Sequence, residues 1–172
     1  MRRYELEPVD DGFVDAAPSR FVNSVVVDAS PASVWAALED AAAWPRWAKA
    51  IKRVEWTSAL PRGVGTTRTV TMVGKMTVFE EFIAWDPHRR MAFRFNEASM
   101  NGVAAFAERY ELEPVEPDRT RVTWVMAMRP KGVSRTIVPI TSLPMRLTFG
   151  RWLRGFKRLV EAEYCETPAR ET

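Results

Sequence analysis

Cysteine and histidine are nearly absent from this chain of 172 residues, which contains one of each. A lone thiol, Cys165, excludes an internal disulfide and makes a thiol-based metal cluster implausible. The lone histidine, His88, follows Pro87 in a turn-like segment, so we expect it on the surface and not as a general base. The sequence also lacks a P-loop, a dinucleotide-binding fingerprint and a G-x-S-x-G motif. We therefore predict neither a metal ion nor a cofactor.

Long apolar runs are also missing, since no segment approaches the ~20 residues that a membrane-spanning helix needs. The amino-terminal MRRYELEPVDDG has basic residues but no apolar stretch behind them, unlike a secretory signal. We expect one domain, because domains typically contain ~100–200 residues, and a cytoplasmic location. The expected division is an N-terminal extension at 1–20, a folded domain at 21–165 and a C-terminal tail at 166–172.

The charge is modest, with a net value of +3, but its distribution is uneven. Between residues 129 and 160 no acidic residue occurs, and the basic residues there are Arg129, Lys131, Arg135, Arg146, Arg151, Arg154, Lys157 and Arg158. The simpler interpretation is the solvated face of a terminal helix, and the alternative is peripheral contact with an anionic membrane. We predict no nucleic-acid partner, because these residues occupy one helix and a loop without a base-stacking motif. The oligomeric state does not follow from the sequence.

Between residues 21 and 129 the sequence predicts one strand, two short helices and then six more strands. Phe21–Val27 is β-branched and predicts a strand. Ser30 then suits the N-cap of a helix with Pro31 in its first turn, and Trp44–Trp47 predicts a second short helix. From Ile51 the period becomes two, and the predicted strands span 51–60, 65–73, 76–86, 90–97, 103–114 and 120–129. Their short connections predict an antiparallel meander.

The C-terminal part returns to helical periodicity. Ser142 can cap this helix, with Pro144 in its first turn and the helix reaching Tyr164. The predicted apolar stripe consists of Leu143, Leu147, Trp152, Phe156, Leu159 and Val160. A sheet that is apolar on one face must bury that face, and this helix is the large partner available.

Alternation along the strands predicts which side chains face this helix. In the strand at 76–86 the preferred inward set includes Val78, Phe82 and Ala84, although Ile83 and Trp85 compete with it. The predicted ligand-binding residues are the inward side chains nearest the helix, together with two from the helix: Arg68, Val70, Met72, Val78, Glu80, Phe82, Phe93, Phe95, Phe106, Glu108, Tyr110, Trp124, Met126, Trp152 and Phe156.

Three charged residues, Arg68, Glu80 and Glu108, fall on the apolar side. A buried charge costs several kcal/mol unless it is paired or hydrated. Either Arg68 and Glu80 form a structural pair across neighbouring strands, or all three groups line a hydrated cavity and orient the polar end of a ligand. In a third interpretation the strand register is shifted by one residue and the three groups face solvent. If the chain is an enzyme, these are its candidate catalytic groups, since a buried carboxyl can move a proton and an arginine can stabilise an enolate.

Four segments resemble the START-like helix-grip (SRPBCC) superfamily, and most closely its polyketide cyclase/dehydrase and lipid-transport branch. They are SPASVWAALEDAAAWPRW, GVGTTRTV, the E-x5-D spacing of Glu80 and Asp86, and TRVTWVMAMRP. The resemblance covers about residues 20–164. It implies an α+β fold in which a seven-stranded curved antiparallel sheet wraps around a long C-terminal helix, with two short helices after the first strand. It also implies an internal cavity for lipids, polyketides or aromatic compounds, and plant abscisic acid receptors of similar layout place the equivalent of Glu80 in the pocket.

Three functions follow as hypotheses. The first is a carrier or sensor that binds a small hydrophobic ligand in the cavity, because the inward face is rich in aromatic residues and methionine. The second is a polyketide cyclase or dehydratase that acts on such a ligand. The third is a membrane- or protein-interaction module that uses the basic C-terminal helix.

Overall fold

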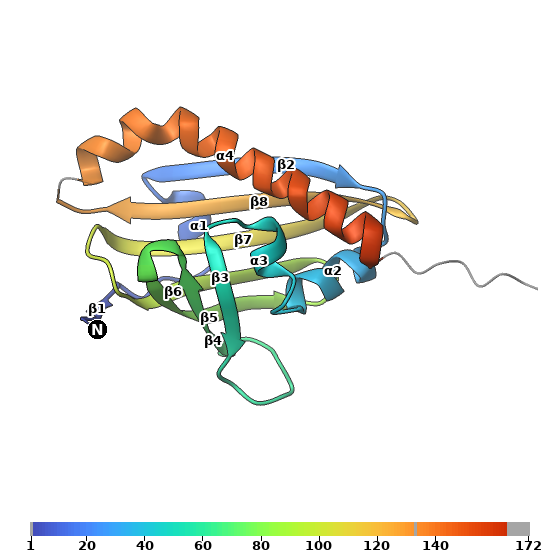
Figure 1. The fold of residues 1–172 in the computed structure, drawn as a ribbon, viewed down its shortest axis with the longest axis horizontal. Coiled ribbons are helices and arrows are strands. Elements are labelled where there is room, and N and C mark those ends of the chain that lie inside the picture. Colours follow the sequence, from blue (N-terminus) through green and yellow to red (C-terminus); the bar gives the residue numbers. More distant parts are fainter. Residues whose placement is uncertain (1, 133, 165–172) are drawn as a thin grey trace, which may run out of the picture.

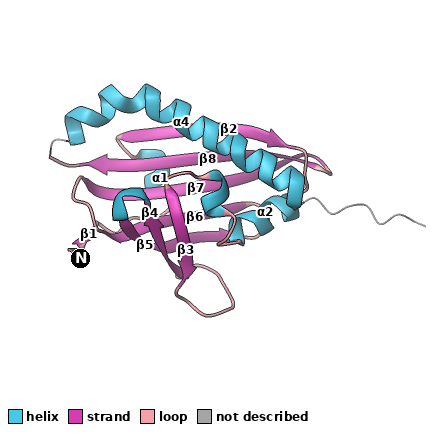
Figure 2. Cartoon of the chain, in the orientation of Figure 1, coloured by secondary structure: helices cyan, strands magenta, loops and turns pink. Residues whose placement is uncertain are grey.

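The computed structural model describes residues 2–132 and 134–164, so Cys165 and the predicted tail lie outside the described residues. A curved antiparallel sheet lies against one long C-terminal helix, with short helices beside it (Figures 1 and 2). The sheet order is β2-β8-β7-β6-β5-β4-β3, and the short strand β1 pairs with β6. The strands are β1 Tyr4–Glu5, β2 Ser19–Val27, β3 Ile51–Trp56, β4 Thr67–Met72, β5 Thr77–Asp86, β6 Arg90–Ala98, β7 Val103–Glu116 and β8 Arg119–Pro130.

The predicted fold class is confirmed. The seven long strands run in the predicted order, and the helices α2 (Pro31–Glu39) and α3 (Trp44–Trp47) follow the first of them. The Ser30 Oγ accepts a hydrogen bond from the Ser33 backbone N–H at 3.2 Å, which satisfies one of the free donors at the start of α2. Two smaller elements, α1 (Phe13–Ala16) and the 3-10 turn η1 (Val73–Lys75), complete the described part of the chain together with the last helix, α4 (Ser134–Glu163).

Helix α4 begins earlier than the sequence predicts. It starts at Ser134, so the prediction that Ser142 caps it is wrong, and both Pro139 and Pro144 lie inside it. Proline removes one backbone donor and disfavours helix in the preceding residue, but a long helix can tolerate this with a bend. In Figure 1 the helix changes direction in its N-terminal half. The prolines therefore mark a bend and not the helix boundary.

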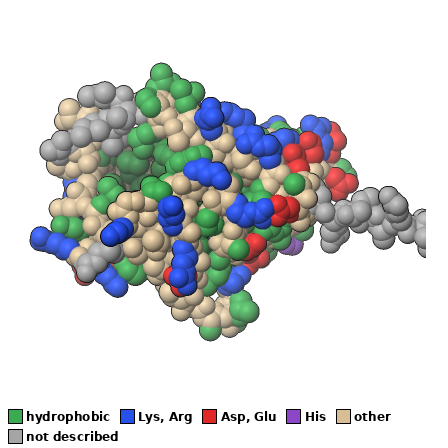
Figure 3. Space-filling model, in the orientation of Figure 1, with side chains coloured by type: hydrophobic (Ala, Val, Ile, Leu, Met, Phe, Trp, Pro, Cys, Tyr) green, Lys and Arg blue, Asp and Glu red, His purple; other side chains and the backbone are tan. Residues whose placement is uncertain are grey.

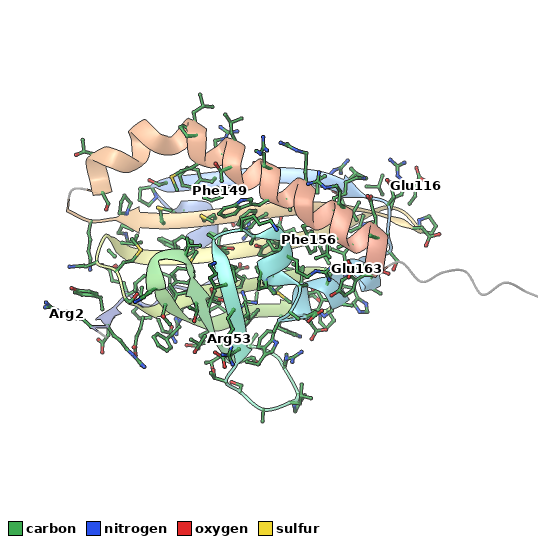
Figure 4. The ribbon with its side chains drawn as sticks, viewed as in Figure 1. Arg2, Arg53, Glu116, Phe149, Phe156 and Glu163 are labelled. Carbon is green, nitrogen blue, oxygen red and sulfur yellow. The ribbon has the colours of Figure 1, made fainter. Side chains whose placement is uncertain are left out.

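The predicted apolar stripe of α4 is also partly wrong. Leu143 and Leu147 are 66% and 63% exposed, whereas Phe149 is buried. The buried face repeats at three- and four-residue spacing from Phe149 through Leu153 and Phe156, and this period places the two leucines on the opposite side of the helix. Figure 4 shows Phe149 and Phe156 projecting from α4 toward the sheet.

Part of the N-terminal segment lies on the other face of the sheet. The helix α1 buries Phe13 and Val14 against small side chains of β7 and β8, among them Ala107 and Ala127. At the edge of this contact the Arg109 guanidinium bonds both carboxylate oxygens of Asp15, at 3.0 and 2.7 Å. The second half of the predicted extension thus covers the convex face of the sheet, whereas Leu6 lies on the concave side.

A β-bulge near the end of β5 changes which of its side chains face the inner core. Registration between β5 and β6 shifts between Phe82 and Ala84, after which Trp85 lies opposite Met91. Directly opposed residues share a face, so Trp85 joins the inner core and Ala84 turns away from it, contrary to the prediction for Ala84. Trp85 packs there against Phe82, with ring centroids 5.0 Å apart.

Among the described residues, no helix is long and apolar enough to cross a membrane. His88 sits in the turn between β5 and β6 with a positive φ of 64°, as expected of a surface turn residue. The described residues contain no group of histidine, cysteine and carboxylate side chains that could hold a metal ion.

Candidate ligand-binding site

A cavity of about 320 Å³ lies between the concave face of the sheet, α3 and α4. Figure 3 shows a hollow with hydrophobic side chains inside it, beneath the N-terminal half of α4. The predicted ligand-binding residues that line it are Arg68, Val70, Met72, Val78, Glu80, Phe93, Phe95, Phe106, Glu108, Tyr110, Trp124, Met126 and Trp152. The side chains converge because consecutive strands present alternate residues to one face.

Phe82 and Phe156 do not line the cavity, although the sequence groups them with the residues that do. Both are fully buried in the solid core. Phe82 packs against Trp56 and Trp85, and Phe156 packs against Trp47 with ring centroids 5.2 Å apart. Their neighbours fill the space that a ligand would need.

The polar end of the cavity is built around Arg68 of β4. Its Nε donates to the Glu80 Oε2 at 2.5 Å, and the two side chains are 1% and 5% exposed. The strands β4 and β5 place these residues directly opposite each other, which explains the pairing. The structure therefore shows the predicted pair and places both of its members at the cavity wall.

Aromatic rings enclose the Arg68 guanidinium. Its central carbon lies 4.2 Å from the ring centroid of Trp44, 4.4 Å from Phe93 and 5.0 Å from Phe82, all within range of cation–π attraction. The Arg68 Nη1 is nevertheless buried without a hydrogen-bond partner in the described part of the chain. A buried donor left unsatisfied costs ~1–3 kcal/mol. An acceptor on a bound molecule would remove that cost.

Glu108 of β7 adds a second buried carboxyl. Its Oε2 accepts hydrogen bonds from the Trp124 Nε1 at 2.9 Å and from the Tyr110 hydroxyl at 3.2 Å. Burial, and secondarily the negative charge of Glu80, raises the pKa of Glu108 to about 8. At neutral pH most of the carboxyl is therefore protonated, and it can donate a hydrogen bond.

The pKa values of the neighbouring Glu80 and Tyr110 are also raised. Burial raises the pKa of Glu80, but the Arg68 guanidinium opposes this shift by its charge and its hydrogen bond. Burial, followed by the charge of Glu108, raises the pKa of Tyr110 well above its usual value of 10, so the phenol stays neutral at physiological pH. The polar end thus contains one guanidinium, the Glu80 carboxyl that is paired with it and the Glu108 carboxyl, whose pKa is about 8.

Several residues of the cavity wall are absent from the predicted ligand-binding set. Trp44 and Trp47 come from α3, which is too short to show which of its sides faces inward. Phe149 and Met145 come from the part of α4 where the predicted stripe is wrong. Leu6 comes from the N-terminal segment beside β1. The other wall residues outside the predicted ligand-binding set are Ala48, Ile51, Met76, Ala98, Met100, Val103, Met128 and Ser134.

The comparisons with known proteins agree with this architecture. The family described as "Polyketide cyclase / dehydrase and lipid transport" matches residues 18–161. An uncharacterised protein of Mycobacterium tuberculosis is 42% identical over 161 residues, which cover 94% of this chain and 96% of that protein. A Mycobacterium bovis protein, also uncharacterised, matches equally well.

Solved structures share the fold at low sequence identity. The Zhui aromatase/cyclase from Streptomyces sp. R1128 superposes with a TM-score of 0.69 at 16% identity, covering 90% of this chain and 99% of that chain. A START superfamily protein from Mycobacterium smegmatis superposes with a TM-score of 0.61 at 16% identity, covering 84% of this chain and 96% of that chain. At such identities the likeness establishes the fold alone.

Proposed function

We propose that this chain, which belongs to the polyketide cyclase/dehydrase and lipid transport family, binds a small hydrophobic molecule in its cavity as a carrier or sensor. The observation that carries the proposal is the apolar cavity of about 320 Å³, whose wall includes Arg68, a residue whose buried Nη1 has no hydrogen-bond partner among the described residues. Ligand sites combine apolar walls with a few convergent polar groups and have volumes of ~300–1,000 Å³. We also propose that the wall residues named above make the contacts with this molecule.

A titration with the neutral apolar dye N-phenyl-1-naphthylamine tests the proposal. Trp44, Trp47 and Trp124 lie at the cavity wall, so binding should quench their fluorescence. The variant Ala98→Phe places a ring in the cavity and should weaken binding at least about tenfold, whereas Ala59→Phe, on an exposed loop, should not change it. Absence of dye binding, or equal binding by Ala98→Phe, would count against the cavity as the site.

Native mass spectrometry of protein purified from its own host provides a second test. A carrier or sensor should retain a bound apolar species of constant mass, and the Ala98→Phe variant should lose it. Repeated purification without any such species would argue against the carrier function.

A second candidate is a cyclase or dehydratase, favoured by Glu108. A carboxyl whose pKa is about 8 can exchange a proton near neutral pH, and the Arg68 Nη1 could donate to a developing enolate. The description of the family gives this candidate a substrate class, polyketides. Glu108→Gln should then abolish turnover of such a substrate and leave its binding intact. Unchanged turnover in that variant would exclude Glu108 as the proton-transfer group.

A third candidate, peripheral contact with an anionic membrane, is favoured by the outer face of α4. Exposed Leu143 and Leu147 lie on the same side of this helix as Arg151, Arg154 and Arg158, and none of these three arginines has an ion pair within the described residues. Figure 3 shows the basic side chains gathered along the helix. Leucines beside cations suit the interface of an anionic bilayer. Vesicles containing phosphatidylglycerol should bind the protein in a salt-dependent manner and phosphatidylcholine vesicles should not; equal binding to both would remove this candidate.

A further inference from the structure

The buried charges at the polar end of the cavity are already balanced without a ligand. Arg68, Glu80 and Glu108 all line the cavity, and all three are buried. The single guanidinium is paired with Glu80, so its charge is neutralised within the protein. Glu108 contributes either no charge, when protonated, or a second negative charge, when ionised. With the Arg68–Glu80 ion pair formed, the net charge of this cluster is therefore zero or negative.

A ligand with a negative charge would meet no free positive charge there. When Glu108 is protonated, a ligand carboxylate would bring the cluster to a net charge of −1, and an ionised Glu108 would bring it to −2. Uncompensated charge is expensive in an apolar interior, where Coulomb interactions are screened far less than in water. A buried anion next to two carboxyls would therefore bind poorly, even though the Arg68 Nη1 could hydrogen-bond to it.

An uncharged acceptor meets no such penalty. The Arg68 Nη1 offers an unused donor. The Glu108 Oε2 already accepts two hydrogen bonds, so in the protonated form the proton belongs on Oε1, from which it can be donated. Each of these donors suits a carbonyl oxygen, which accepts hydrogen bonds and carries no charge.

We propose that the cavity selects apolar molecules whose polar group is an uncharged carbonyl, such as a ketone, ester or amide, and discriminates against the carboxylate of a free fatty acid. This inference rests on the proposed binding function and specifies the class of ligand. It follows from the count of one buried guanidinium against two buried carboxyls at the same wall.

Dodecanamide and dodecanoate form a matched pair of probes, because they have the same chain and nearly the same shape but differ in charge at pH 7. Titration of the tryptophan fluorescence should give a dissociation constant for dodecanamide at least about tenfold lower than for dodecanoate. Equal affinities, or tighter binding of dodecanoate, would overturn the inference. This comparison uses the wild-type protein alone and so does not depend on whether any variant folds.

The variant Glu80→Gln tests the charge count directly. It keeps an acceptor for the Arg68 Nε but leaves the guanidinium charge without a counter-charge, so the preference should reverse in favour of dodecanoate. Glu81→Gln is the matched control, since Glu81 is the next residue of β5, on the opposite face, where it bonds Arg94 and Asn96. This control should keep the wild-type preference. An unchanged preference in a folded Glu80→Gln variant would contradict the inference.

The outcome also separates this inference from the proposed function. If both probes bind but dodecanoate binds as well as dodecanamide, the cavity binds apolar molecules and only the charge selectivity is wrong. If neither probe binds and N-phenyl-1-naphthylamine also fails to bind, the proposed function is wrong and this inference is overturned with it.

Discussion

The protonated state of Glu108 can be tested through the stability of the fold. In the folded protein, burial and the charge of Glu80 raise the pKa of this carboxyl from 4.5 to about 8. Between these two values the unfolded chain has released the proton while the folded chain retains it. The free energy of unfolding therefore falls as pH rises through this window, by about 1.4 kcal/mol per pH unit for one group.

The isosteric variant Glu108→Gln removes the titration but keeps an acceptor for the Trp124 Nε1 and the Tyr110 hydroxyl. Urea unfolding of both proteins from pH 5.5 to 7.5 should show that the wild type loses about 3 kcal/mol relative to the variant. The subtraction cancels groups that titrate alike in both proteins, and Glu81→Gln controls for removal of a partly exposed carboxyl. A difference between wild type and Glu108→Gln that stays constant over this range would refute the argument, because the carboxyl would then have an ordinary pKa.

Three further predictions concern the free energy of unfolding. Arg68→Met should destabilise the fold by about 3–5 kcal/mol in urea unfolding, because it leaves Glu80 buried and unpaired. The double variant Arg68→Met/Glu80→Leu should recover most of this loss, and no recovery would mean that the unpaired charge is not the cause. Phe156→Ala should lower the free energy of unfolding by about 3–5 kcal/mol, whereas Leu147→Ala, on the exposed side of α4, should change it by less than about 0.5 kcal/mol. Similar losses in the two variants would contradict the orientation of the helix. Ser30→Ala should lower stability by about 1 kcal/mol through loss of the N-cap, and an unchanged unfolding midpoint would show that the cap is unimportant.

Alternation along the strands was the most informative signal in the sequence. A period of two is fixed by strand geometry, so it placed Arg68 and Glu80 on one face, and the two residues prove to be direct neighbours across β4 and β5. The same rule failed for Ala84, because a β-bulge inserts one extra residue and nothing in the local sequence marks it.

Helix α4 shows why the rest could not be predicted. The sequence predicts Pro144 in the first turn of the helix, but Pro139 and Pro144 both lie inside a bent helix, and the late predicted start shifts the apolar stripe toward Leu143 and Leu147. Similarly, α3 has only one turn, so its period could not show that Trp44 and Trp47 face the cavity. The position of the N-terminal segment depends on packing against distant strands, and local periodicity contains no information about that contact.

A crystal structure of the protein with dodecanamide tests the central claim most directly. The account predicts electron density for the alkyl chain beside Trp124 and Phe106, with the amide oxygen within hydrogen-bond distance of the Arg68 Nη1. An interior closed by its own side chains, or a probe bound only on the outside of the protein, would contradict it.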